Sequence, residues 1–257
     1  IYQSSGCPMG IKTRIIPVLL WDEHGCVKGQ RFNPGRRIGS MMDRIRLLER
    51  RDVDELIILD IAATPNNRGP RFDEVSQLCE NLFCPVTVGG GVRNVSDIRR
   101  LLASGADKVA INTMACERPE FIDAAAQRFG SQAIVAAIDV GPETRVHSVC
   151  GRKNTERHPV HWAAELENRG AGEILLTSID RDGTMDGYDI DLIREVADVV
   201  SIPVVAAGGC GSYEHIAEVL YSTKAHAVAV GAAFQFCEMT PKGASRYLHD
   251  QGFQVRL

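Results

Sequence analysis

Four apolar segments from the first half of the chain recur in the same order in the second half, displaced by 118 to 119 residues. Buried strands resemble one another because Val and Ile dominate them, and this explains a single match. It does not explain four matches in order with glycines in register, as where CPVTVGGG at 84–91 falls on IPVVAAGG at 202–209. The repeat therefore predicts a fold made of two similar halves. The other three pairs are RIIPVL at 14–19 with AIVAAI at 133–138, DELIILD at 54–60 with AGEILLTS at 171–178, and ADKVAIN at 106–112 with KAHAVAVG at 224–231.

Short apolar runs alternate with amphipathic segments along the chain. The apolar runs are typical of buried parallel strands and lie at 13–20, 55–61, 85–89, 108–112, 133–139, 173–178, 203–207 and 227–231. Helix-like segments follow them near 41–50, 72–81, 95–104, 119–129, 159–169, 190–198, 213–221 and 241–250, leaving two long loops at 21–40 and 140–157. Eight strand–helix pairs predict an α/β fold, a (β/α)₈ TIM barrel built from two similar half-barrels, as a single domain over residues 1–257. A doubly wound open sheet is the alternative, but it usually has fewer strands and does not predict the repeat.

Composition narrows the classes of partner and compartment. The net charge of −4 over 257 residues gives no reason to expect nucleic acid or a membrane surface as a partner. No run approaches the ~20 apolar residues of a transmembrane helix, and the N-terminal stretch lacks the apolar run of a signal peptide. The eight cysteines are scattered without a CxxC pair, and the seven histidines form no ligand cluster. We therefore expect a cytoplasmic protein with neither a metal nor a cofactor.

Glycine-bearing stretches follow equivalent strands of the two halves. AAGG at 206–209 and VGAA at 230–233 follow strands seven and eight, which form the usual phosphate site of this fold. VGGG at 88–91 and AINT at 110–113 hold the same places in the first half. Glycines can mark tight turns alone, but a duplicated set favours two phosphate sites and hence a long substrate with a phosphate at each end. The candidate phosphate-binding residues here are Gly90, Gly91, Asn112, Thr113, Gly208, Gly209, Gly231 and Ala232.

Acidic residues stand at the ends of strands five and six, on the face where barrel enzymes place their catalytic groups. Asp139 ends strand five, and TSIDRDGTMDGYD at 177–189 supplies Asp180 and Asp182 after strand six. If the Asp180 carboxylate is used within the loop, Asp182 points into the open end of the barrel where the strands finish. Asp139 and Asp182 are therefore candidate catalytic residues, and Thr177 and Gly183 are candidate substrate contacts in the same stretch.

The whole pattern resembles the cyclase subunit of imidazole glycerol phosphate synthase (the HisF-type family) from about Lys12 to Leu257. The resemblance rests on LDI at 59–61, VTVGGGV, GADKVAINT, FGSQAIVAAID, GRKNT at 151–155, RGAGEILLTSIDRDGTMDGYD and the final VRL. It implies a subunit that receives ammonia from a HisH-like glutaminase and uses it on a ribulosyl-aminoimidazole ribonucleotide. In that family two aspartates do the acid–base work.

One of these two aspartates is missing here. The acid after strand five matches Asp139, but the family's strand-one motif CLDVKDGRVVKG is matched by VLLWDEHGCVKG at 18–29, where Leu20 replaces the aspartate. The repeat agrees, because Leu20 lies 119 residues before Asp139. Leucine cannot transfer a proton. Asp22, two residues on, could face the same way and is a third catalytic candidate, although its Cα would lie ~7 Å further along the strand.

The resemblance also implies an ammonia gate at the opposite end of the barrel. The family's ring of charges is matched by Arg14, Glu55, Lys108 and Glu173, all at strand starts. A single charge there is most simply a solvated strand end, but four with alternating sign favour the gate. Lys28 matches the family's lysine in loop one.

Three functions remain open. Leu20, together with RIIPxLL in strand one and QRFNPGRRIGS at 30–40, resembles a side branch of the family that works with a glutaminase and a sugar amidotransferase in making amidino-sugars for surface polysaccharides (lipopolysaccharide O-antigen). The alternative is an authentic cyclase of histidine biosynthesis. The second alternative is a non-catalytic barrel that activates a glutaminase, against which the retained Asp139, Asp182 and phosphate loops argue.

Overall fold

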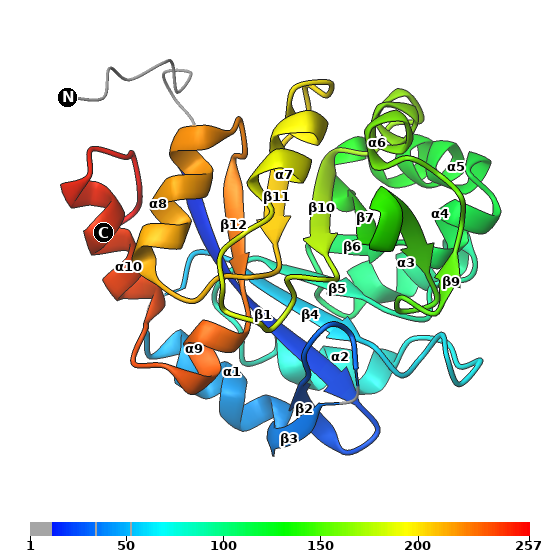
Figure 1. Cartoon of the computed structure of the whole chain (residues 1–257). Coiled ribbons are helices and arrows are strands. Elements are labelled where there is room, and N and C mark those ends of the chain that lie inside the picture. The colour runs from blue at the N-terminus through cyan, green and yellow to red at the C-terminus, as the bar shows by residue number, and fades with distance from the viewer. Residues whose placement is uncertain (1–11, 34, 52) are drawn as a thin grey trace.

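A computed structural model describes residues 12–33, 35–51 and 53–257 of the chain; Cys7 and the N-terminal stretch considered for a signal peptide lie outside them. Within these residues eight parallel strands pair in a closed ring (Figure 1). The ring is closed by β10 pairing with β7, from Glu173↔Val135 to Ser178↔Val140. The predicted (β/α)₈ barrel is therefore confirmed, and the open sheet is excluded. In ring order from β1, the strands are β1 (Arg14–Asp22), β4 (Leu56–Asp60), β5 (Val86–Gly89), β6 (Lys108–Ile111), β7 (Ile134–Gly141), β10 (Glu173–Ser178), β11 (Val204–Ala207) and β12 (Ala227–Val230).

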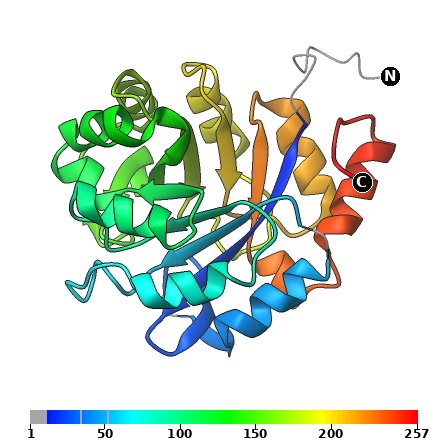
Figure 2. The ribbon, with the colours of Figure 1, turned by 180° about the vertical axis from the view of Figure 1, so that it is seen from behind.

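Helices surround the strands on all sides (Figures 1 and 2). Eight of them follow the eight barrel strands: α1 (Met41–Glu49), α2 (Phe72–Cys79), α3 (Val95–Ala103), α5 (Glu120–Phe129), α6 (Pro159–Asn168), α7 (Ile190–Ala197), α8 (Tyr213–Ser222) and α10 (Pro241–Asp250). Local sequence sets several of their starts. Asn94 and Asp97 form a reciprocal capping box on α3, and Ser212 caps α8 by accepting from the backbone N–H of His215.

The two halves of the chain have the same internal order. Strands β1, β4, β5 and β6 are contiguous in the ring, as are β7, β10, β11 and β12. Each half also contains a short helix that the sequence reasoning missed, α4 (Thr113–Glu117) after β6 and α9 (Ala232–Phe236) after β12. Five-residue helices are too short to show the apolar periodicity that predicts a helix.

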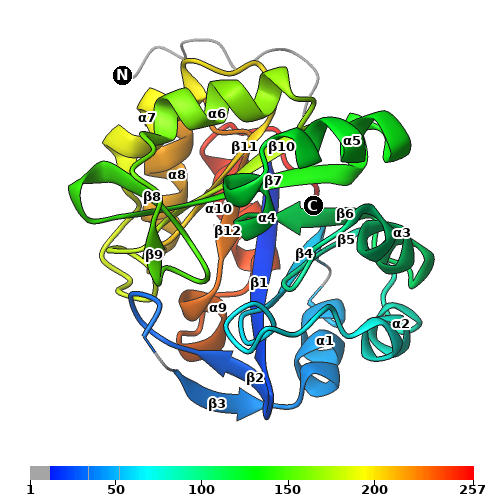
Figure 3. The same ribbon diagram turned by 90° about the vertical axis from the view of Figure 1, so that its right-hand side faces the viewer.

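Both segments expected to be long loops contain antiparallel strands. The first forms β2 (Gly25–Lys28) and β3 (Arg36–Gly39), and the second forms β8 (Arg145–Ser148) and β9 (Lys153–Asn154) (Figure 3). Two 3₁₀ turns, η1 (Ser131–Ala133) and η2 (Pro142–Thr144), flank β7. Strands β1 and β7 run two residues past their expected ends, because β2 and β8 supply hydrogen-bond partners there. Each half thus projects one hairpin beyond the barrel.

Strand side chains alternate between two apolar cores. Ile15 and Leu19 of β1 pack outward against the helices, whereas Ile16 and Val18 point into the barrel. The barrel interior is lined by Ile16, Ile57, Ala110, Val135, Leu175, Val205, Ala207, Ala227 and Ala229, with Val18, Leu59 and Ala137 above them. We call the end where the strands finish the mouth and the end where they start the N-terminal face. Among the described residues, no helix has the length and apolar character needed to span a bilayer.

Candidate functional site: the barrel mouth and the charge ring

Asp139 lies at the end of β7 and faces the mouth. Its register partner on β10 is Thr177, whose side chain is hydrogen-bonded to the carboxylate. Asn112, at the end of β6, donates from Nδ2 to Asp139 Oδ2 at 2.7 Å and to the backbone oxygen of His147 at 3.1 Å. Asn112 and Thr177, from the two strands beside β7, therefore fix the orientation of this carboxylate.

The environment of Asp139 disfavours its charge. Burial raises the pKa of Asp139 to about 7, and the nearby charge of Asp182 adds to the rise, while the hydrogen bonds from Asn112 and Thr177 oppose it. A carboxyl group with a pKa near 7 can accept and return a proton at neutral pH. Asp139 therefore has the properties of a general acid–base group.

Leu20 occupies the equivalent place on β1. Ile16 and Val18 point into the barrel, so by the strand period of two Leu20 does the same. It pairs with Leu59 of β4 and with Val27 of β2, and its side chain is partly exposed. The β1 side of the mouth is thus apolar where the β7 side carries a carboxylate.

Asp22 lies in the turn between β1 and β2. Its Oδ1 accepts from the backbone N–H groups of His24 at 2.7 Å and Gly25 at 3.1 Å. These are the bonds of an Asx turn, which favours the hairpin. The structure therefore assigns the Asp22 carboxylate to the turn and does not bring it together with Asp139.

Lys28 and Asp182 form an ion pair across the mouth, with Lys28 Nζ 2.9 Å from Asp182 Oδ1. Lys28 is buried, whereas Asp180 is exposed, as expected if Asp182 is the inward carboxylate. The backbone N–H of Arg31 also donates to the backbone carbonyl oxygen of Asp182 at 2.8 Å, and a Cβ on Gly183 would lie 2.4 Å from the backbone oxygen of Gly29. The segment after β2 therefore crosses from the first half onto the second, and Gly183 allows the close approach.

The two predicted phosphate loops have closely similar backbones. Asn112 and Gly231 precede α4 and α9 with φ/ψ of −119/−76° and −105/−82°. Gly90 and Gly208 both have positive φ, +111° and +91°, and both are partly exposed. A Cβ on Gly231 would lie 3.2 Å from Lys28 Nζ, so this amine is next to the second loop.

Other members of the predicted phosphate set are engaged within the protein. Gly91 and Gly209 are buried, and a Cβ on them would meet the backbone oxygens of Arg68 at 2.7 Å and Gly187 at 2.0 Å. They hold neighbouring loops close together, which is the tight-turn role of glycine. Thr113 Oγ1 accepts from the backbone N–H of Val149 at 3.0 Å, and Ala232 is buried at the start of α9.

The four charges predicted at the strand starts form a closed ring at the N-terminal face. Glu55 lies 2.6 Å from Arg14 and 2.8 Å from Lys108. Glu173 pairs with the same two cations, at 2.7 Å from Lys108 and in contact with Arg14. Both glutamates are buried, while Arg14 and Lys108 are partly exposed. We call these four residues the charge ring.

Mutual attraction stabilises the ionised forms within the charge ring. Burial alone would raise the pKa of Glu173, but the charges and hydrogen bonds of Arg14 and Lys108 lower it below its ordinary value. Burial likewise works to lower the pKa of Arg14, and the attraction of Glu173 and Glu55 raises it instead. Glu173 and Arg14 therefore stay charged at neutral pH, and the four side chains lie across one end of the apolar barrel interior.

Sequence reasoning missed a second buried carboxylate at the mouth, Asp60 at the end of β4. Its oxygens lie 2.9 Å from Arg68 and 3.2 Å from Arg71, and it accepts from the backbone N–H groups of Ala62 and Ala63. An acid at a strand end is the pattern that identified Asp139, so LDI at 59–61 could have identified Asp60 in the same way. Its ion pairs and buried position indicate that it orders the loop after β4.

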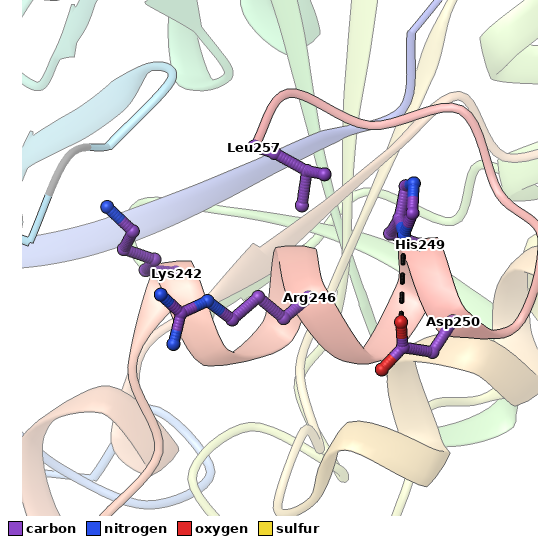
Figure 4. Close-up of a pocket in the computed structure, with 5 residues that line it drawn as sticks. All are labelled: Lys242, Arg246, His249, Asp250 and Leu257. Carbon is purple, nitrogen blue, oxygen red and sulfur yellow. Dashed lines mark ion pairs between the residues drawn. The ribbon is translucent and has the colours of Figure 1, made fainter.

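Two further observations concern metal ligands and a pocket away from the barrel mouth. Among the described residues no three His, Cys, Asp or Glu side chains group as metal ligands do. A surface pocket lined by Lys242, Arg246, His249, Asp250 and Leu257 lies against α10 and includes none of the predicted site residues (Figure 4).

Comparison with known proteins agrees with this geometry. The model of the family described as "Histidine biosynthesis protein" matches residues 14–240. Two proteins named "Imidazole glycerol phosphate synthase subunit HisF", from Caulobacter vibrioides strains NA1000/CB15N and ATCC 19089/CB 15, are each 45% identical over 252 residues, covering 96% of this chain and 97% of theirs. A match of this extent, on a doubled barrel with these strand-end residues, shows that the chain belongs to the HisF-type histidine biosynthesis protein family.

Proposed function

We propose that this chain is the synthase subunit of a glutamine-dependent enzyme and uses ammonia from a HisH-like glutaminase on a substrate with a phosphate at each end. The observation that carries the proposal is the arrangement of two features on one barrel axis. The charge ring closes the N-terminal face, and Asp139 stands at the mouth between the two glycine loops.

Ammonia would pass between these two features through the apolar barrel interior. Above the charge ring, much of the interior is lined by small side chains, including Ala110, Ala207, Ala227 and Ala229. Neutral ammonia is stable in such surroundings, whereas ammonium would lose its hydration there. An opening of the ring would therefore admit ammonia and exclude bulk ions.

The proposed substrate contacts follow the repeat. One phosphate would lie at the loop of Gly90 and Asn112, and the other at the loop of Gly208 and Gly231. Backbone N–H groups bared by glycine are suited to phosphate oxygens. Lys28, next to Gly231, would add a positive charge at the second loop.

The names of the relatives favour imidazole glycerol phosphate synthesis over the sugar-amidation branch. This is the authentic cyclase of histidine biosynthesis that the sequence left open as an alternative. Asp139 would be the acid–base group. Asp182 would serve as a second carboxylate once its ion pair with Lys28 opens. The apolar Leu20 predicts a slow reaction, because loss of one general acid or base typically costs ~10²–10⁴ in rate.

Leu20 also supports a second candidate, delivery of ammonia to a sugar. In that case the barrel would pass ammonia on with the help of a sugar amidotransferase, and the proton transfers of cyclisation would not be needed. The retained phosphate loops argue against the third candidate, a barrel that only activates a glutaminase.

One experiment separates these candidates. The purified chain is given the ribulosyl-aminoimidazole ribonucleotide, first with ammonium chloride and then with glutamine and the HisH-like glutaminase from the same organism. Formation of imidazole glycerol phosphate with both nitrogen sources supports the synthase. Substrate binding and glutaminase stimulation without product would instead favour sugar amidation, and absence of both would refute the proposal.

A further inference from the structure

The second hairpin places an imidazole beside Asp139 at the mouth. His147 lies on β8 directly opposite Asp139 in the antiparallel β7–β8 pair (Figure 3). The next residues of this pair, Val140 and Val146, lie opposite each other and pack outward in the core between the strands and the helices. Because strand side chains alternate between the two faces, Asp139 and His147 both face inward. Side chains opposite one another on one face have Cβ atoms about 5 Å apart, so these two are neighbours.

The position of the His147 ring explains a glycine in β7. Gly141 stands two residues after Asp139 and therefore shares its inward face. A Cβ on Gly141 would lie 2.7 Å from Cε1 and 2.8 Å from Nδ1 of His147. The imidazole thus lies against the inward face of β7, just beyond Asp139, in space that any other residue at 141 would fill. The side chain is partly exposed, so a molecule bound in the mouth can reach it.

A single hydrogen bond sets which nitrogen of His147 is free. Its Nδ1 lies 2.9 Å from the backbone oxygen of Arg145. A carbonyl oxygen only accepts, so Nδ1 carries the proton and donates, and Nε2 of the neutral ring is left with a lone pair. Within the part of the chain that the structure describes, no group is hydrogen-bonded to Nε2. This nitrogen can therefore take a proton from a bound molecule and, once protonated, return it.

One amide holds His147 and Asp139 together. Asn112 Nδ2 donates to Asp139 Oδ2 at 2.7 Å and to the backbone oxygen of His147 at 3.1 Å. Cys116 Sγ lies 3.4 Å from Asn112 Oδ1 and donates to it, which fixes the end of the amide that faces the carboxylate. Asn112 also belongs to the first glycine loop, the place proposed for one phosphate. The carboxylate, the imidazole and this loop are thus held in one geometry, as proton transfer to a bound substrate requires.

We infer that His147 is a further catalytic residue, an acid–base group that works with Asp139 on one side of the bound substrate. This inference rests on the proposed function. Leu20 faces the other side of the mouth and remains apolar, so the two groups serve the β7 side alone.

The proposed step is the addition of ammonia to the carbonyl of the ribulosyl group. The C–N bond forms and the electron pair of the C=O π bond moves to oxygen. The Asp139 carboxylate takes one proton from the added nitrogen, and the His147 imidazolium gives its Nε2 proton to that oxygen. Transfer of the proton from the Asp139 carboxyl to His147 through water then restores both groups, so the pair moves one proton from nitrogen to oxygen and is itself unchanged.

The test measures steady-state kinetics of the intact chain with ammonium chloride and the ribulosyl-aminoimidazole ribonucleotide. His147→Ala should lower kcat about 10²-fold with little change in KM, because a general acid–base group is lost while the phosphate loops remain. Imidazole added to the buffer should restore part of that kcat by entering the space left by the ring. His147→Gln fills the space and can hydrogen-bond but cannot transfer a proton, so it should be as slow and should not respond to imidazole.

His249→Ala is the matched control. His249 is an exposed histidine of α10, beside Asp250 and remote from the mouth, so its loss should leave the kinetics unchanged with and without imidazole. Thermal melting of the three variants checks that the barrel is folded. If His147→Ala does not fold, the comparison of His147→Gln with wild type decides.

Three outcomes would overturn the inference. Wild-type kcat in His147→Ala or His147→Gln would remove His147 from proton transfer while leaving the proposed function intact. A rise in KM at unchanged kcat would make the imidazole a binding group only. A slow His147→Ala that imidazole does not restore would assign a structural role. If wild type binds the substrate but forms no product, the proposed cyclisation fails and the inference fails with it.

Discussion

Leu20 and Asp139 hold equivalent places at the ends of β1 and β7, strands that are four positions apart whichever way the ring is followed. An apolar side chain and an acid–base carboxylate therefore stand on opposite sides of one mouth. Both strands continue into an antiparallel hairpin at this point, with Leu20 opposite Val27 and Asp139 opposite His147. Leu20, where the family has an aspartate, thus changes the chemistry of one side of the mouth, while the backbone framework is the same on both sides.

Restoring a carboxylate opposite Asp139 should increase cyclisation. We expect Leu20→Asp to raise the rate of imidazole glycerol phosphate formation about 10²-fold with ammonia supplied directly, because a second general acid–base group becomes available. Steady-state kinetics with ammonium chloride avoid any effect of the glutaminase. Leu20→Asn is the control, similar in size and polarity but unable to transfer a proton, and an equal increase with it would contradict the prediction.

Asp22 should matter for the hairpin and little for proton transfer. In Asp22→Asn the side-chain oxygen can still accept from His24 and Gly25, so activity should fall by far less than the ~10²-fold cost of losing a general acid. Asp22→Ala removes both bonds and should destabilise the protein by about 1 kcal/mol in urea unfolding. Loss of activity in Asp22→Asn at unchanged stability would instead make Asp22 the displaced catalytic acid.

The activity should rise with pH as Asp139 ionises. If Asp139 acts as a base, kcat/KM increases through a pH of about 7. Asn112→Ala removes a hydrogen bond that lowers this pKa, so the inflection should move to higher pH. A pH–rate profile of both forms measures the shift, and an unchanged inflection would mean that another group controls it.

The same pKa has a consequence for stability. Because the folded pKa of Asp139 is above the unfolded value of 3.8, the folded state holds the proton more tightly, and the contribution of Asp139 to wild-type stability falls as pH rises from about 4 to about 7. Asp139→Asn has no such proton to lose. The difference in free energy of unfolding between Asp139→Asn and wild type should therefore shift in favour of the variant by up to about 4 kcal/mol between pH 4 and pH 8, at about 1.4 kcal/mol per pKa unit. Denaturant unfolding at the two pH values tests this, and a constant difference would contradict it.

Breaking the charge ring should affect both stability and ammonia transfer. Lys108→Met leaves Glu55 and Glu173, both buried, with Arg14 as their one remaining partner within the ring, and should lower the free energy of unfolding by about 3 kcal/mol. Glutamine-dependent product formation should fall relative to the ammonia-dependent reaction. Lys224→Met is the control, since its ion pair with Asp198 is exposed and its loss should cost less than about 1 kcal/mol. Equal coupling in the two variants would argue against a gate.

Local patterns along the chain were sufficient for the fold and for part of the site. Apolar runs of strand length, their alternation with helical segments and the displacement of 118 to 119 residues determine a doubled barrel, because each is visible along the sequence without knowledge of which segments meet in space. Strand ends follow from the same runs, so Asp139 could be named in advance, whereas the members of the charge ring were named from the resemblance to the HisF-type family. The short helices α4 and α9 were missed because five residues are too few to show helical periodicity, and the hairpins in the two long loops were missed because their strands are only two to four residues long.

Contacts that exist only in the folded chain decided the rest. Asp22 looked like a substitute for the missing acid, but the turn that it caps takes up its carboxylate. Gly91 and Gly209 were named as phosphate-loop glycines from sequence, and the packing of other loops against them gives a further reason for their lack of a side chain. Residue type and spacing determine which groups reach the mouth or the N-terminal face, whereas hydrogen-bond partners and burial depend on the folded chain, because the segments that supply them meet only when the barrel closes.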